Sequence, residues 1–425
     1  MKIAVNHLAR IEGHANLVID SARGQVRELR LEIVEAPRFF EPMLKGCHYS
    51  EVAPIAARIC GICSNSHTLV SLEASERALG IEVSEQTRQL RRLLAFGEIL
   101  QSHLVQLYFM ALPDYYGVAS ILPLVHSERA LVHHALELKR LANDILRVIG
   151  GRPVHPVTPV VGGFTRLPDA AELMDLRRRL VLVLPDLEAT VEIFAGLDYP
   201  DFEREVTALS LLGDGDYPVF GDTLVTSGGR GAAVADFRDL VEEYQVPWST
   251  AKFARMDGRD YMVGPLARLR NNHDRLSAMA RQVAEALDVG PATANPYRIL
   301  PARLVEVVHG VERSIHLIDD LLLAGLQEEE LPAPDRFGAA VAVIEAPRGL
   351  LFHAYDYGDD GRIRAADCII PTAQNLASIE ADLRLRVPQV LDLGREDLTR
   401  QCEQLIRAYD PCISCSTHLL RVDFD

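Results

Sequence analysis

Short runs of alternating or β-branched apolar residues lie near both ends of the chain, as is typical of β-strands. Near the start this pattern predicts strands at residues 2–5, 14–19 and 25–34, with a turn at residues 21–24. Near the end it predicts strands at residues 340–344, 350–355 and 362–370, with a hairpin turn at residues 358–361. We therefore expect two small sheets, one close to each terminus.

Between these ends, apolar residues recur at helical spacing. Ser127 is the expected N-cap of one helix, and Gly150-Gly151 its expected stop. A Pro- and Gly-rich connection at 155–168 and a surface linker at 328–334 interrupt the pattern. The predicted long helices lie at residues 85–110, 127–149, 169–197, 264–287, 301–323, 372–383 and 396–409.

Together these elements predict a mainly α-helical fold with small β elements. Its centre is a bundle of long helices, and the N- and C-terminal segments would have to come together for the two cysteine pairs near the chain ends to meet. We divide the chain into a β-rich N-terminal part (1–63), a helical bundle (64–199 and 264–330), a peripheral lobe (200–263), a C-terminal part (340–418) and a short tail (419–425).

Composition and charge exclude several classes of protein. A chain of 425 residues with 48% hydrophobic and 24% charged residues can bury a large core. Its net charge of -16, without a basic stripe, argues against nucleic-acid binding. We find no uncharged apolar run of roughly 18 residues and no secretory signal at the N-terminus, so we expect no transmembrane segment and a cytoplasmic location.

Four of the seven cysteines form two C-x-x-C pairs, Cys60 with Cys63 and Cys412 with Cys415. Such a pair directs two thiolates at one point, as a soft metal or a redox dithiol requires. We expect the two pairs to meet and to hold one metal centre. A structural zinc site and a thioredoxin-like dithiol are the alternatives, but zinc modules usually place their pairs close in sequence, and no βαβ pattern surrounds either pair here.

The residues around the pairs are more specific. The early pair reads Arg-x-Cys-Gly-x-Cys-x-x-x-His from Arg58, and the late pair reads Asp-Pro-Cys-x-x-Cys-x-x-His from Asp410. These motifs resemble the paired signatures of the NiFe hydrogenase large subunit, and the resemblance extends over nearly the full chain. The blocks at 37–41 and 112–115 are most similar to the cytoplasmic, bidirectional, NAD(P)-linked sulfhydrogenase type.

The resemblance implies a catalytic subunit that cleaves H2 reversibly and heterolytically at a nickel–iron centre. Cys60 and Cys412 would be terminal ligands of nickel. Cys63 and Cys415 would bridge nickel to an iron that carries CO and two cyanides. Four thiolates suit such a soft, electron-rich site, and Cys412 could accept the proton released from H2.

Three residues near the centre are implied in the same way. Glu12 matches a proton-gate glutamate, although alone it would be read as a turn residue. Arg348 matches an arginine that lies over the open metal position and binds a cyanide, a suitable role for a permanently charged, directed donor. Without the resemblance it would be read as part of a surface salt bridge. Asp410 would hold Arg348 in place.

Two further side chains complete the implied surroundings. Thr372 would bind the other cyanide, or else act as a helix N-cap. His67 would donate a hydrogen bond to a bridging cysteine, expected to be Cys63. One departure matters: many family members have Asp-His where this chain has Ser102-His103, so one carboxylate near the nickel is missing.

The resemblance also implies a magnesium or similar divalent ion near the C-terminus. Its ligands would be the side chains of Glu41 and His418 and the backbone carbonyl of Cys368, because oxygen ligands suit magnesium. Cys47 and Cys402 are expected to be buried or inert thiols.

Partners are implied because the chain lacks a further set of cluster-binding cysteines and any dinucleotide-binding glycine motif. We expect an Fe-S small subunit and flavin- and NAD(P)-binding electron-transfer subunits. We also expect maturation factors, including an endopeptidase that removes residues 419–425.

Three other functions remain as alternatives. One is a hydrogen-sensing regulatory subunit with the same centre. The second is a non-enzymatic relative in respiratory complex I, which has lost the nickel cysteines that this chain retains. The third is a structural zinc protein.

Overall fold

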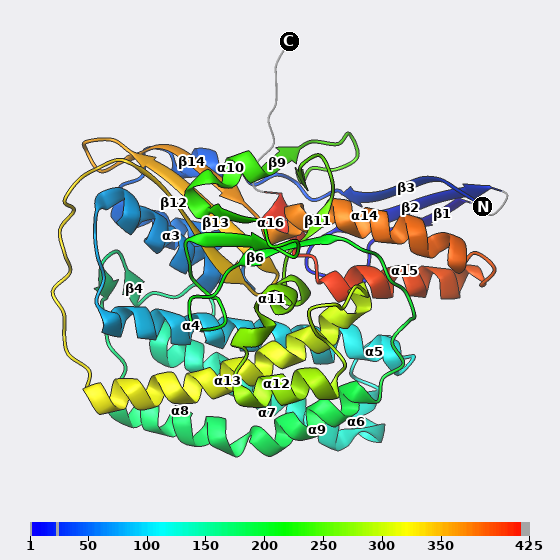
Figure 1. Ribbon diagram of the computed structural model, residues 1–425, viewed down its shortest axis with the longest axis horizontal. Coiled ribbons are helices and arrows are strands. Elements are labelled where there is room, and N and C mark those ends of the chain that lie inside the picture. Colours follow the sequence, from blue (N-terminus) through cyan, green and yellow to red (C-terminus); the bar gives the residue numbers. More distant parts are fainter. Residues whose placement is uncertain (1, 23–24, 418–425) are drawn as a thin grey trace, which may run out of the picture.

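The computed structural model of the chain describes residues 2–22 and 25–417. Long helices form a layer that fills the lower half of Figure 1. In this layer α4 (Glu85–Leu104) packs against α7 (Arg129–Gly150) and α13 (Ile299–Ala324), and α13 also packs against α8 (Ala170–Leu182). Helical spacing explains the packing, because the buried positions of α7 recur three and four residues apart at Leu131, Ala135, Leu138, Ala142, Ile145 and Ile149. The prediction of a mainly helical fold with small sheets is confirmed.

Two predicted helices are each broken in two. The expected helix at 169–197 is α8 followed by α9 (Leu184–Ala195), and Pro185 in the first turn of α9 explains the break at Val183 because it has no N–H to continue α8. The expected helix at 264–287 is α11 (Pro265–Asn272) followed by α12 (Ala278–Ala286). Here the Asn272 side chain bonds the carbonyl oxygen of Leu211, so it competes with the helix backbone.

Other boundaries also differ from the prediction. Ser127 is not the N-cap of α7: it ends the short helix α6 (Leu124–Ser127), and Glu128 takes the N-cap position. The helix predicted to end at residue 110 is α-helical to Leu104 and then continues as a π-helical segment (Val105–Ala111) into α5 (Leu112–Tyr115).

The C-terminal sheet is antiparallel in the order β12 (Ala339–Ala346), β13 (Gly349–Tyr357) and β14 (Ile363–Ile369), in agreement with the predicted strands and hairpin turn. Helix α3 (Ser64–Leu79) packs on β12 and β13. This packing places the start of α3, where the first cysteine pair lies, against the C-terminal part of the chain (Figure 1).

The N-terminal sheet consists of β1 (Lys2–Val5), β2 (Ala15–Ala22) and β3 (Gln25–Ile33) in antiparallel order. Alternate residues of β2 are buried, which confirms the period read from the sequence. Helix α14 (Pro371–Gln389) packs on β3 and on α15 (Arg395–Tyr409). The N-terminal strands and the last long helices therefore lie side by side, as the right half of Figure 1 shows.

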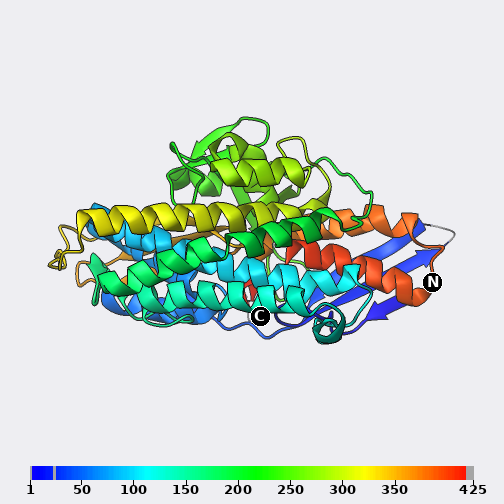
Figure 2. The same ribbon diagram turned by 90° about the horizontal axis from the view of Figure 1, so that it is seen from below.

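Residues 207–262 carry short strands that protrude from one side of the helical layer (green, Figure 2). Their apolar side chains share a core with β12 and β13, where Leu209 and Leu224 join a cluster that includes Val343 and Phe352. The strands are β6 (Thr207–Leu211), β7 (Thr223–Thr226), β8 (Gly231–Ala233), β9 (Val241–Tyr244), β10 (Phe253–Met256) and β11 (Tyr261–Met262).

The remaining elements are short. They are α1 (Phe40–Leu44), α2 (Tyr49–Ala56), β4 (Pro159–Val160), β5 (Gly163–Phe164), α10 (Phe237–Leu240), α16 (Ile413–Ser416) and four 3-10 turns (Ala57–Ile59, Val234–Asp236, His273–Arg275 and Pro296–Arg298). Within residues 2–22 and 25–417, no helix combines the length and apolar character needed to span a bilayer.

Candidate metal centre

The four predicted cysteines lie at the ends of helical elements. Cys60 follows a 3-10 turn, and Cys63 is the N-cap residue of α3. Cys412 follows α15 by three residues, and Cys415 lies in the short helix α16. Asp410 adopts a left-handed backbone conformation with φ of 57° directly after α15. This turn directs the chain back toward the first cysteine pair.

The two pairs meet, as predicted. The Sγ atoms of Cys60 and Cys412 are 3.3 Å apart, and those of Cys63 and Cys415 are 3.1 Å apart. All four sulfurs lie within 4.8 Å of one another, all four residues are buried, and none forms a disulfide. Among the described residues, this is the one group of His, Cys, Asp or Glu side chains close enough to hold a metal ion in common.

The chemistry of this cluster fits a soft cation. Hydrogen bonds from the neighbouring thiols, that of Cys412 first, lower the pKa of Cys60 well below its usual range. Burial raises the pKa of Cys415 well above its usual range. Four buried thiolates therefore cannot coexist without a compensating positive charge, which a metal ion held by the four sulfurs would provide.

A cavity of about 10 Å³ borders three of the cysteines, Cys63, Cys412 and Cys415. Arg348 and Thr372 contribute polar groups to its lining. Its remaining lining is apolar apart from His67 and consists of Ala346, Pro347, Leu351, Ile370 and Pro371. The cavity is therefore a small space beside the sulfurs whose lining is apolar except for Arg348, Thr372 and His67.

Glu12 touches the second cysteine pair. Its Oε2 accepts a hydrogen bond from Cys412 Sγ at 3.2 Å and another from the backbone N–H of Ser414 at 2.9 Å. Its backbone carbonyl accepts from the N–H of Ile413 at 3.0 Å. The side chain is half-buried, so it lies between the sulfur and the outer part of the molecule.

Arg348 lies in the turn between β12 and β13, and it is held by Asp410 as predicted. Its Nε donates to the carbonyl oxygen of Asp410 at 2.7 Å, and NH2 donates to Asp410 Oδ1 at 3.0 Å. NH1 donates to Ser102 Oγ at 3.3 Å, so the serine substitutes for the missing carboxylate as a hydrogen-bond acceptor. Burial alone would lower the pKa of Arg348, but Asp410 and the sulfur of Cys412 raise it well above its usual range. The guanidinium is therefore a fixed positive charge beside the cysteines.

Thr372 is at the second position of α14 and is not an N-cap, because Ile370 takes that position. Thr372 Oγ1 accepts a hydrogen bond from the backbone N–H of Cys412 at 2.9 Å. The α14 N-terminus thereby contacts the second cysteine pair.

His67 lies one turn into α3, and its backbone N–H donates to the carbonyl oxygen of Cys63 at 3.1 Å. Its Nδ1 is 3.1 Å from His353 Nε2. The expected hydrogen bond between the imidazole and Cys63 stays a prediction.

Glu41 and Cys368 lie together, 7% and 0% exposed. Glu41 Oε1 accepts a hydrogen bond from the backbone N–H of Cys368 at 3.0 Å. The third expected ligand of the divalent ion, His418, lies outside the described residues, as does the tail at 419–425. The magnesium site stays a prediction.

Two residues that support the cysteines were missed in the sequence. Arg38 donates hydrogen bonds to the backbone carbonyls of Ile59 and Ser414, so it ties the two cysteine segments together. Glu98 accepts from the N–H groups of Asn65 at 2.7 Å and Ser66 at 2.8 Å, which satisfies the start of α3 next to Cys63. The Pro-Arg-Phe-Phe-Glu block around Arg38 was a visible signal, whereas Glu98 looks like any helical glutamate.

The other cysteines differ from each other. Cys402 and Cys368 are fully buried, and burial raises the pKa of Cys402 to about 12, in agreement with an inert thiol. Cys47 is only partly buried, and burial raises the pKa of its thiol, so its place as an inert thiol stays a prediction. Cys47 follows the short surface helix α1, and its thiol donates to the carbonyl oxygen of Met43 at 3.3 Å.

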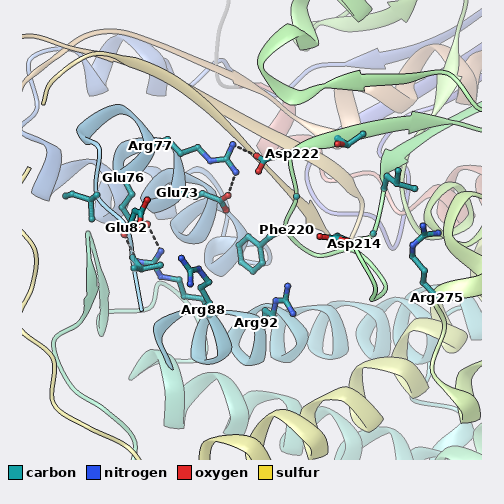
Figure 3. Close-up of a pocket in the computed structure, with 17 residues that line it drawn as sticks. Glu73, Glu76, Arg77, Glu82, Arg88, Arg92, Asp214, Phe220, Asp222 and Arg275 are labelled. Carbon is teal, nitrogen blue, oxygen red and sulfur yellow. Dashed lines mark hydrogen bonds and ion pairs between the residues drawn. The ribbon is translucent and has the colours of Figure 1, made fainter. Parts of the chain in front are cut away.

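A much larger cavity of about 1070 Å³ lies away from the cysteines, between α3, α4 and the protruding strands (Figure 3). Arg88 and Arg92 extend from α4 toward Phe220, and Arg77 links Glu73 with Asp222 (Figure 3). None of the predicted site residues lines this cavity.

Known proteins match nearly the whole chain. A family model described as nickel-dependent hydrogenase matches residues 38–130 and 226–418. The sulfhydrogenase 1 subunit alpha of Pyrococcus furiosus is 37% identical over 99% of this chain and 99% of its own length. The NAD-reducing hydrogenase HoxS subunit beta of Cupriavidus necator is 27% identical over 99% of this chain and 95% of its own length.

A solved structure of similar fold is an NAD+-reducing [NiFe]-hydrogenase in the H2-reduced state. It superposes with a TM-score of 0.89 and 30% sequence identity, and the match covers 98% of this chain and 99% of that chain. Nearly the whole chain therefore shares its fold with that protein.

Proposed function

The chain belongs to the nickel-dependent hydrogenases, and we propose that it is a catalytic large subunit that converts H2 reversibly into two protons and two electrons. The observation that carries this proposal is the group of four buried cysteine sulfurs within 4.8 Å, assembled from opposite ends of the chain. Both C-x-x-C motifs of the sequence thereby become one site.

The four cysteines would hold nickel and iron. Cys60 and Cys412 are the proposed terminal ligands of nickel, and Cys63 and Cys415 the proposed bridges to iron. Metal ions in this position would supply a Lewis acid at which H2 is polarised for heterolytic cleavage. The sulfur–sulfur distances of 3.1–3.3 Å within and between the pairs support a shared set of ligands.

One proton from H2 would pass from the Cys412 sulfur to Glu12. The geometry supports this step because Glu12 Oε2 lies 3.2 Å from that sulfur, within hydrogen-bond reach. The half-buried position of Glu12 gives the proton an outward direction.

Iron would carry CO and two cyanides, and two side chains would donate hydrogen bonds to the cyanides. The guanidinium of Arg348 and the hydroxyl of Thr372 both line the small cavity beside Cys63 and Cys415. An anion such as cyanide needs directed donors in a water-poor space, and these two groups offer them. A magnesium ion near Glu41 and the carbonyl of Cys368, completed by His418, is part of the same proposal.

Electrons would leave through an Fe-S small subunit and continue through flavin- and NAD(P)-binding subunits. The relatives support the association with partner subunits, since one is subunit alpha of a sulfhydrogenase and another is subunit beta of an NAD-reducing hydrogenase. We place the complex in the cytoplasm. Maturation factors would insert the metals, and an endopeptidase would then remove residues 419–425.

Infrared spectroscopy of the complex purified from its source tests this function. Bands of metal-bound CO and cyanide are expected, together with H2-dependent reduction of NAD(P). Active H2 oxidation without such bands would remove the diatomic ligands from the proposal. Zinc without nickel and iron, together with no H2 uptake, would replace it by a structural zinc protein.

A second candidate is a hydrogen sensor with the same centre. The metal-site geometry serves both functions equally, because a sensor must also bind H2. Turnover distinguishes them: a catalytic subunit reduces NAD(P) with H2 in its native complex, whereas a sensor complex does not.

A further inference from the structure

Arg348 has one carboxylate partner among the described residues, Asp410. Its other acceptor, Ser102, is neutral. The position of this guanidinium beside the cysteines therefore depends on how firmly Asp410 is held.

We propose that Arg303 is a positioning residue that holds Asp410, and through it Arg348, over the metal centre. This inference rests on the proposed function and names a residue of α13 that makes no contact with the cysteines. Arg303 is fully buried, and its NH1 lies 3.3 Å from Asp410 Oδ2. Asp410 thus presents one oxygen to Arg348 and the other to Arg303.

Arg303 also fixes the backbone that carries Asp410. Its NH2 donates to the carbonyl oxygen of Tyr409 at 3.2 Å, at the last residue of α15. Asp410 then turns with a left-handed φ of 57°, a conformation that L-residues rarely adopt unless neighbouring groups hold them. Two residues later the chain reaches Cys412, so the contact controls both the arginine and one metal ligand.

Arg303 is itself fixed by His103. Its NH1 lies 3.1 Å from His103 Nδ1, and an arginine can only donate, so Nδ1 must be the accepting nitrogen. Nε2 therefore carries the hydrogen and donates to Glu306 Oε2 at 2.7 Å. Burial lowers the pKa of His103 to about 3, in agreement with a neutral ring in this single tautomer.

Glu306, the hydrogen-bond partner of His103, is itself held by further side chains. Its Oε1 accepts from Arg268 Nε at 2.6 Å and from the Tyr217 hydroxyl at 2.7 Å, and its Oε2 accepts from Arg268 NH2 at 2.7 Å. Arg268 continues to Glu345 Oε2 at 2.9 Å. The three arginines Arg268, Arg303 and Arg348 and the three acids Glu306, Glu345 and Asp410 are all buried.

This buried network packs three arginine side chains against three acidic side chains. Removal of the Arg303 charge leaves a negative excess next to Asp410, in a region where water cannot compensate for it. Asp410 is then free to move, and the Arg348 guanidinium moves with it. A displacement near 1 Å at a reacting centre can cost roughly 100-fold in rate.

The test uses Arg303→Met in the complete native complex, with Arg313→Met as the matched control. Arg313 lies on the same helix but pairs at the molecular surface with Asp216, with 29% of its side chain exposed. For Arg303→Met we expect kcat per bound nickel to fall about 10- to 100-fold. Nickel content and the KM for H2 should stay close to wild type, while the paramagnetic resonance spectrum of nickel changes. Arg313→Met should match wild type in all four measurements.

A second substitution separates positioning from folding. Ser102→Asn places a neutral amide oxygen beside Arg348 NH1, a second acceptor that adds no charge, so in the Arg303→Met background it should restore part of kcat and move the nickel spectrum back. If Arg303→Met does not yield folded complex, Arg303→Lys keeps the charge but cannot reach Tyr409 and His103 together, and it should show the same spectral change.

Wild-type kcat per nickel and an unchanged nickel spectrum in Arg303→Met, or in Arg303→Lys where Arg303→Met does not fold, would overturn the inference. A wild-type complex that binds no nickel and oxidises no H2 would instead overturn the proposed function. The two failures are therefore distinguishable.

Discussion

At the scale of single residues, the centre combines thiols with two groups of opposite function. Glu12 accepts a hydrogen bond from the Cys412 thiol. Arg348, which is paired with Asp410, provides a permanent positive charge beside the cysteines. One group can take a proton away from sulfur, and the other can stabilise negative charge near it. The distances make each role separately testable.

Glu12→Gln should keep the metal centre but slow proton transfer. Glutamine can still accept from the N–H of Ser414, but it cannot bind the proton, so we expect H2 turnover to fall by about 100-fold or more. H2–D2 exchange and metal content would be measured on the same preparation. Glu35→Gln is the control, because Glu35 accepts from Ser414 Oγ nearby without a contact to sulfur. Equal losses in both variants would contradict the proton role.

His103 should make the protein less stable in acid. Its pKa is lowered from 6.5 to about 3 by burial, so below pH 6.5 the unfolded chain binds a proton that the folded chain does not. Stability is therefore fully present above pH 6.5 and is lost as the pH falls toward 3, by up to about 1.4 kcal/mol for each pH unit.

His103→Gln should flatten this dependence, because glutamine can keep both hydrogen bonds without titrating. Melting temperatures of wild type and variant would be measured between pH 4.5 and pH 7. Parallel curves would show that His103 does not contribute to the acid sensitivity.

At the scale of elements, the turn between β12 and β13, which carries Arg348, is packed closely against the backbone that precedes α11. Gly264, which precedes α11, has φ of 109°, and a Cβ built on it would lie 2.8 Å from the carbonyl oxygen of Arg348. Gly349, after Arg348, has φ of 131° and an equally close neighbour in Val263. Only glycine fits both conditions, so these two positions set the place of the β12–β13 turn.

Gly264→Ala should therefore displace Arg348 as well as strain the backbone. We expect a loss of about 1–3 kcal/mol in stability and a lower kcat per nickel. Gly290→Ala is the matched control, because Gly290 has no atom within 4 Å of the added Cβ and lies outside the positive-φ group. A stable Gly264→Ala protein with wild-type kcat would contradict this role of the turn.

The elements also show what sequence could and could not predict. Strand alternation located β2 well, because alternate residues of β2 are buried, whereas the apolar run of β13 is buried along most of its length. Sequence patterns could not locate the helix break at Asn272, since that depends on a side-chain bond to the distant Leu211. Local patterns carry periodicity, whereas such breaks depend on contacts made only after folding.

At the scale of the whole molecule, the fold joins the two ends of the chain at one buried point. The N-terminal sheet meets the C-terminal segment through a backbone bridge between Glu12 and Cys412, and α3 brings Cys63 to the same place. The motif pair made this meeting predictable, because both pairs match one family site. The network around Arg303 was not predictable, since charged residues on a long helix usually face solvent.

Anomalous X-ray scattering at the nickel and iron edges, from crystals of the native complex, tests the central claim most directly. We predict a nickel peak bonded to the sulfurs of Cys60, Cys63, Cys412 and Cys415, with an iron peak that shares Cys63 and Cys415. Zinc at the four sulfurs, or nickel bound elsewhere in an H2-active complex, would contradict it.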